Sequence, residues 1–95
     1  MALVLVDAEN VRRSLWPNLS RDELVERANA WAEREGHEVR IVFEGERSAD
    51  DEIAALAAAH KGAQLWVVTS DRELRRRVDP YADRIVGGGA FARML

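Results

Sequence analysis

Four short apolar segments limit the fold of this chain more than any other feature of its sequence. Ala2–Val6 is apolar at every position and is stopped by Asp7, and Gln64–Thr69 is apolar between its two polar ends. Two further strands are expected: Glu38–Phe43, centred on Val39, Ile41, Val42 and Phe43, and the brief Arg84–Val86. A short run that is apolar on both faces is typical of a strand inside a parallel sheet. The sequence therefore predicts four strands.

The segments between these strands carry helix signals. Ser20–Glu23 and Ser70–Glu73 both have the Ser-x-x-Glu pattern of a capping box, and Ser48–Asp51 opens a third helix. Apolar residues recur at helical spacing behind the first of these starts, at Leu24, Val25, Ala28, Trp31 and Ala32. Gly36 suits the end of that helix. The Gly87–Gly89 run follows the last strand with no convincing helix after it.

The order β-α-β-α-β-α-β predicts the architecture. Strands joined by helical crossovers pair in parallel and carry helices on both faces of the sheet. We expect a three-layer α/β/α fold with a doubly wound, four-stranded parallel sheet in the order 2-1-3-4. Residues 1–95 are expected to form a single domain, because this length suits one domain and not two.

Composition narrows the class of protein. The apolar share of 47% and charged share of 33% are those of a soluble globular chain, and no apolar run approaches a membrane span. The amino-terminal sequence lacks a basic region and a cleavage site, so we expect a cytoplasmic protein with no signal peptide. Without cysteine, any metal must be held by oxygen or imidazole. The net charge of −3 argues against bulk coating of nucleic acid but does not exclude a nuclease.

Acidic residues follow three of the expected elements at positions that should meet in space. Asp7 ends the first strand, Asp71 lies just past the third, and Asp50 begins the helix after the second. The carboxyl ends of parallel strands share one edge, and ligands bind there at the topological switch point. Asn10 can add a neutral polar group at the same place. The sequence therefore predicts an acidic crevice.

Such a crevice favours a bound cation. Two carboxylates ~5 Å apart repel by roughly 3 kcal/mol at an effective dielectric near 20. Oxygen donors with open coordination positions suit Mg²⁺ or Mn²⁺. The alternative is that each helix-start acid only stabilises its helix through capping and the macrodipole. That explanation suffices for any one of them alone, but the joint placement favours a functional site.

Four segments resemble the motifs of one family. Val6–Val11 is similar to the "VDGxN" opening of NYN domains in the PIN-like ribonuclease group, and Ser48–Ile53 resembles their "xADxxI" helix start. Val67–Arg72 resembles "VVTSDR", and Gly87–Ala90 resembles the closing "GxGA" loop. The closest resemblance is to YacP-like NYN proteins. Ala8 and Glu9 depart from the usual Gly-Tyr, and the chain is shorter at its C-terminus than many relatives.

The resemblance implies a metal-dependent endoribonuclease. It assigns Asp7, Asp50 and Asp71 as catalytic ligands of Mg²⁺ or Mn²⁺. It further implies supporting roles around those ligands for Asn10, Asp51, Thr69 and Ser70, with Asp51 the less direct member. The expected partner is RNA, with a link to the ribosome left open.

Basic and aromatic residues around the acids are candidates for RNA contact. Phosphates flanking a scissile bond would meet Arg72, Arg76, Arg12 and Arg47; the alternative is a solvated surface. Trp16 could stack on an unpaired base, although packing beneath its own loop is the favoured expectation. The apolar C-terminus, with Phe91, Met94 and Leu95, leaves open a homodimer or closure of the core.

Two other functions compete with the nuclease. The first is a non-catalytic RNA- or ribosome-binding module of the same fold. The second is a metal-dependent phosphatase or phospho-acceptor domain with Asp7 after its first strand. Against the second, Asp7–Asn10 lacks the DxDx[TV] pairing, and no lysine ends a later strand.

Overall fold

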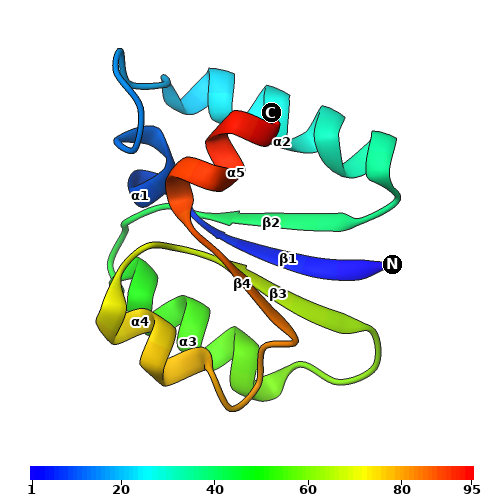
Figure 1. The fold of residues 1–95 in the computed structure, drawn as a ribbon. Helices are drawn as coiled ribbons and strands as arrows, with labels where there is room; N and C mark the ends of the chain where they lie inside the picture. The colour runs from blue at the N-terminus through cyan, green and yellow to red at the C-terminus, as the bar shows by residue number, and fades with distance from the viewer.

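The computed structural model describes all 95 residues, and its centre is a four-stranded parallel sheet (Figure 1). The strands are β1 (Ala2–Asp7), β2 (Glu38–Val42), β3 (Gln64–Val68) and β4 (Arg84–Val86). They lie side by side in the order β2-β1-β3-β4, with every neighbouring pair parallel. The predicted sheet and strand order are confirmed.

Five helices cover the two faces of this sheet. They are α1 (Ala8–Arg12), α2 (Arg21–Glu35), α3 (Ala49–Ala59), α4 (Arg72–Val78) and α5 (Gly88–Met94). Figure 1 shows α2 and α5 on one side of the sheet and α3 and α4 on the other. The expected three-layer α/β/α arrangement is therefore present. None of the helices combines the length and apolar character needed to cross a bilayer.

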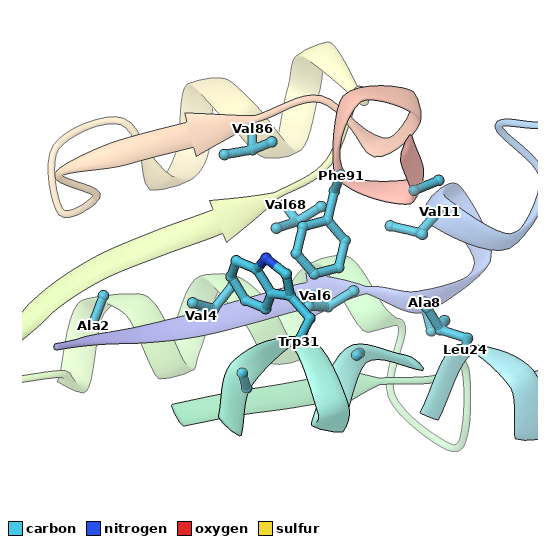
Figure 2. Packing of buried hydrophobic residues seen from close by; sticks show 13 residues of the cluster. Ala2, Val4, Val6, Ala8, Val11, Leu24, Trp31, Val68, Val86 and Phe91 are labelled. Atoms are coloured by element: carbon cyan, nitrogen blue, oxygen red, sulfur yellow. The ribbon is translucent and has the colours of Figure 1, made fainter. Parts of the chain in front are cut away.

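One core fills the space between the sheet and the layer of α1, α2 and α5. Val4 and Val6 of β1 point into it, and Trp31 and Phe91 face them from α2 and α5 (Figure 2). The two rings meet edge to face, with centroids 5.0 Å apart and planes 82° apart. This geometry places the positive ring edge over the negative ring face and adds to the area buried.

The second core lies on the opposite face of the sheet. Leu5, the residue between Val4 and Val6, points into it and joins Ile53 of α3 and Leu74 of α4. Side chains alternate between the faces of a strand, so an unbroken apolar run supplies both cores at once. This is the physical reason why β1 must be apolar throughout.

The helix starts agree with the sequence in two cases and differ in one. Ser20 and Glu23 form the predicted capping box of α2, and Ser48 caps α3. The capping box predicted at Ser70 is wrong. The residue that caps α4 is Asp71, because its side chain accepts a hydrogen bond from the Leu74 amide while the Ser70 hydroxyl is engaged by Gly88.

The C-terminal segment corrects another expectation. Gly88–Met94 is helical, although three consecutive glycines predict poor helix formation. Short helices take most of their stability from tertiary packing, and Phe91 supplies it by burying all but 1% of its surface. Of the three apolar residues considered for a partner surface, Phe91 therefore closes the core, while Met94 remains 38% exposed.

Candidate functional site

A polar pocket of about 620 Å³ opens where the carboxyl ends of β1, β2 and β3 meet. β2 and β3 flank β1 on opposite sides, so this is the switch point of the doubly wound sheet. No hydrophobic side chain lines the pocket. Its lining consists of Asp7, Glu9, Asn10, Arg13, Ser14, Glu44, Asp50, Ser70, Asp71 and Gly89. The three predicted acids therefore surround one cavity.

Asp7 forms the floor of the pocket. It is the last residue of β1 and only 6% exposed. Its Oδ2 accepts a hydrogen bond of 2.9 Å from the hydroxyl of the fully buried Thr69. Burial raises the pKa of Asp7 above its ordinary 3.8, and the nearby Asp50 and Asp71 carboxylates raise it further. The Thr69 hydroxyl and the Asn10 backbone amide act in the opposite direction.

Thr69 links the two strand-end acids. Its hydroxyl donates to Asp7 and accepts a 3.1 Å hydrogen bond from the backbone amide of Asp71. By donating one hydrogen bond and accepting another, the Thr69 hydroxyl fixes the positions of the ends of β1 and β3 relative to each other. Asp71 itself is exposed, and its Oδ1 caps α4. Its second carboxylate oxygen has no hydrogen bond within the protein.

Asp50 enters the pocket from the first turn of α3. It is half-buried, and this burial raises its pKa, followed by repulsion from Asp71 and from Glu44. Arg77 acts in the opposite direction. Glu44 lies in the loop after β2, where its Oε1 accepts a hydrogen bond from the Ala49 amide. Carboxylates at the ends of three strands therefore repel one another across one small volume. The sequence predicted all of them except Glu44.

Asn10 and Ser70 tie three loops together behind the acids. The Asn10 Oδ1 accepts a 2.9 Å hydrogen bond from the Ser70 amide, and the Ser70 hydroxyl accepts one of 2.9 Å from the Gly88 amide. The connections after β1, β3 and β4 are joined in this way. Both residues line the pocket, so their hydrogen bonds help to set its shape.

Gly88 is required for this junction. A Cβ placed on it would lie 2.2 Å from the Asn10 Oδ1 and 3.2 Å from the Asn10 carbonyl oxygen. We expect Gly88→Ala to lower the free energy of unfolding by about 2 kcal/mol, because Asn10 must move and release Ser70. Chemical denaturation measures this change. Gly89→Ala is the matched control, because its Cβ would make only ordinary contacts at 3.6 Å or more.

A double-mutant cycle separates that clash from a general effect on α5. In an Asn10→Ala background, Gly88→Ala should cost less than half of what it costs in the wild type, since the obstructing amide is gone. Equal costs in both backgrounds would show that Asn10 is not the cause.

Two acidic residues near the pocket have other partners. Asp51, predicted to support the site, lies outside the pocket, and its Oδ1 accepts a 2.9 Å hydrogen bond from Arg77. Glu9 lines the pocket and forms ion pairs with Arg12 and Arg21. Its negative charge is therefore balanced within the protein.

The four arginines predicted to bind RNA differ in whether their guanidinium groups already have partners within the protein. Arg12 is half-buried and holds both Glu9 and the Leu19 carbonyl oxygen, so it has a structural task. Arg76 pairs with Glu73 on the surface of α4. Arg47 and Arg72 are exposed and make no ion pair. Only these two of the four are free for phosphate.

The sequence alone pointed to neither Glu44 nor Ser14, although both line the pocket. Glu44 follows the second strand, so the rule that found Asp7 and Asp71 would also have found it. Ser14 follows α1, and no local signal marks it. Arg13, which the sequence offers beside Arg12 as a phosphate contact, also lines the pocket, as does Gly89 of α5. Arg13 makes no ion pair and is the one basic side chain in the lining.

The pocket offers oxygen donors that could hold a divalent cation. No three acidic or histidine side chains are already arranged as direct ligands of one ion. The pocket nevertheless presents hard oxygen donors, two of them with raised carboxyl pKa values, in an open polar space. Mg²⁺ uses one or two carboxylates and keeps several waters. The residues therefore fit a hydrated ion better than a closed cage.

The fold and site define a class: parallel α/β domains with an acidic pocket at the switch point. No protein-family model matches the sequence, and no curated protein is significantly similar to it. A crystal structure of a single-residue mutant of Rae1 (YacP) from Bacillus subtilis is similar to the chain. The TM-score is 0.77 and the identity 23%, over 98% of this chain and 74% of that one. The chain thus has a YacP-like, NYN-type fold, as its motifs predicted.

Proposed function

We propose that the protein is a metal-dependent endoribonuclease that hydrolyses RNA phosphodiester bonds at the acidic pocket. The observation that carries the proposal is the buried Asp7 carboxylate, which faces Asp50 and Asp71 across one polar cavity. Mutual repulsion of three carboxylates destabilises the fold, and a bound cation would relieve it. Functional sites are where such perturbed groups gather.

Asp7, Asp50 and Asp71 are the residues that would hold Mg²⁺ or Mn²⁺. The ion supplies charge neutralisation at the phosphate and lowers the pKa of a bound water. The protein contributes the arrangement of its own groups. Thr69 orients the Asp7 carboxylate, and the Asp71 oxygen that does not cap α4 is free for a ligand. Arg13 and Arg72 can bind phosphates beside the reacting one.

The YacP-like fold and the four NYN-like motifs support the same proposal. RNA is the expected substrate, and the cytoplasm is the expected location. The competing phosphatase function has no supporting observation in the pocket. Glu9, which stands where the second Asp of DxDx[TV] would be, is held in ion pairs with Arg12 and Arg21. The non-catalytic RNA-binding module differs from the nuclease only in the absence of cleavage, which the following experiment decides.

Neighbouring acids on α3 provide a matched test. Asp50 lines the pocket, whereas Asp51 points to Arg77 outside it. We expect Asp50→Asn to lower the rate of Mn²⁺-dependent cleavage of an unstructured RNA by more than about 100-fold, the upper end for loss of a supporting residue around a metal. Asp51→Asn should retain the wild-type rate within about threefold, because it alters only an exposed ion pair.

The measurement is a gel assay of end-labelled RNA, with EDTA as the blank. Equal cleavage by both variants and the wild type would show that the activity does not arise at this pocket. RNA binding without cleavage by the wild type, in both Mg²⁺ and Mn²⁺, would support the non-catalytic module.

A further inference from the structure

The loop between α1 and α2 carries an exposed tryptophan beside the acidic pocket. Trp16 is 89% exposed, the largest fraction among the bulky apolar side chains. The expectation that it packs beneath its own loop is therefore wrong. Tryptophan is a costly residue to leave in water, since burial of its large ring is worth several kcal/mol by area. The ring is therefore accessible to a ligand that stacks on it.

The base of this loop is held in place. The Arg12 carbonyl oxygen accepts a hydrogen bond from the Leu19 amide, and the Arg12 guanidinium donates one to the Leu19 carbonyl oxygen at 2.9 Å. Leu15 packs against the hydrophobic core. With its neighbour turned inward and its ends joined, the loop presents Trp16 outward.

The loop also forms one wall of the pocket. Arg13 and Ser14 line the pocket, and consecutive Cα atoms are about 3.8 Å apart, so the Cα of Trp16 lies within about 7.6 Å of that of Ser14. Figure 1 shows the loop on the side of the molecule where the strands end. Trp16 is thus close along the chain to Arg13 and to the pocket, on the same side of the molecule.

We propose that Arg13 and Trp16 form a subsite for one unpaired nucleotide of the RNA substrate. This inference rests on the proposed nuclease function. Arg13 binds the phosphate next to the scissile one, and Trp16 stacks on the base that this phosphate carries. A base within a duplex has both faces covered by its neighbours, so it cannot stack on Trp16.

The test measures RNA binding in the absence of cleavage. The probe is a fluorescently labelled octauridylate in EDTA, followed by anisotropy with the full chain. Trp16→Ala should weaken binding by between about fivefold and 150-fold, the range that base stacking supplies. Trp16→Phe should retain most of the affinity, because it keeps an aromatic face. Tyr81→Ala is the control, since Tyr81 is 49% exposed but follows the far end of α4.

Two further probes separate stacking from charge. An abasic oligomer of the same length should bind the wild type and Trp16→Ala equally, and so should an RNA duplex. Arg13→Gln should weaken binding to the octauridylate and to the abasic oligomer alike, with a shallower salt dependence.

Three results would overturn the subsite: unchanged octauridylate binding by Trp16→Ala, an equal loss on the abasic oligomer, or self-association that requires Trp16 without an effect on RNA. These results are distinct from failure of the nuclease proposal. A Trp16-dependent binder that never cleaves RNA would retain the subsite and lose the nuclease. A Trp16→Ala variant that binds and cleaves RNA like the wild type would support the nuclease and rule out the subsite.

Discussion

Asp7→Asn should abolish metal-dependent RNA cleavage while leaving the folded protein as stable as the wild type or more so. Asn is nearly the same size, and its side-chain oxygen can still accept the Thr69 hydroxyl. The change removes a buried negative charge that faces Asp50 and Asp71. Cleavage should fall by more than about 100-fold, because a direct ligand matters more than the groups that orient it.

Thermal melts measure the other half of this prediction. Without metal at pH 7, Asp7→Asn should raise the melting temperature by up to about 8 °C, which corresponds to about 1 kcal/mol for a domain of this size. With Mn²⁺ at 100 times its dissociation constant, the wild type should gain about 2.7 kcal/mol and the variant little. Asp22→Asn, an exposed change in the first turn of α2, is the control.

The raised pKa of Asp7 adds a dependence on pH. A carboxyl whose pKa is higher in the folded state binds its proton more tightly there. Its stabilising contribution is complete below the ordinary value of 3.8 and is lost as pH rises through the raised value. In the metal-free protein, the free energy of unfolding should decrease as rising pH ionises Asp7, and Asp7→Asn should remove this decrease. A variant that loses several kcal/mol at neutral pH would instead make Asp7 a structural residue.

Phe91→Ala should lower the free energy of unfolding by about 3–5 kcal/mol. Phe91 is 1% exposed and lies edge to face on Trp31. Truncation removes the burial of the ring, leaves a cavity and separates α5 from α2. For a domain of this size the melting temperature should fall by at least about 12 °C.

Met94→Ala on the same helix is the matched control, because Met94 is 38% exposed. It should cost less than about 1 kcal/mol. Urea denaturation at two protein concentrations measures both variants. If Phe91 instead served a dimer, the wild-type midpoint would rise with concentration and the monomer would barely respond to the truncation.

The fold could be predicted because its signals are local. The apolar run of β1, the Ser20–Glu23 capping box and Gly36 each report on a few neighbouring residues, and all three occur as expected. The edge shared by Asp7, Asp50 and Asp71 could also be predicted, because the carboxyl ends of parallel strands lie at the same edge of the sheet. The structure places these acids around one pocket; their role as metal ligands stays a prediction.

The errors in prediction arose where distant segments compete for the same group. Ser70 has the sequence of a helix cap, but Gly88 donates to its hydroxyl, so Asp71 caps α4 instead. Three glycines disfavour a helix locally, yet the burial of Phe91 stabilises α5. Such outcomes depend on contacts across the fold, which no short window of sequence contains.

The sequence by itself determined the alternation of strands and helices, the parallel sheet and the edge at which the acids collect, because hydrophobic periodicity and chain connectivity dictate them. Only the tertiary structure decided which polar groups are free for a ligand. Asp51 and Arg12 are engaged in ion pairs within the protein, whereas Arg13 makes none and Trp16 is exposed. Pairing of side chains depends on distances of a few ångströms between separate loops, and those distances exist only once the chain has folded.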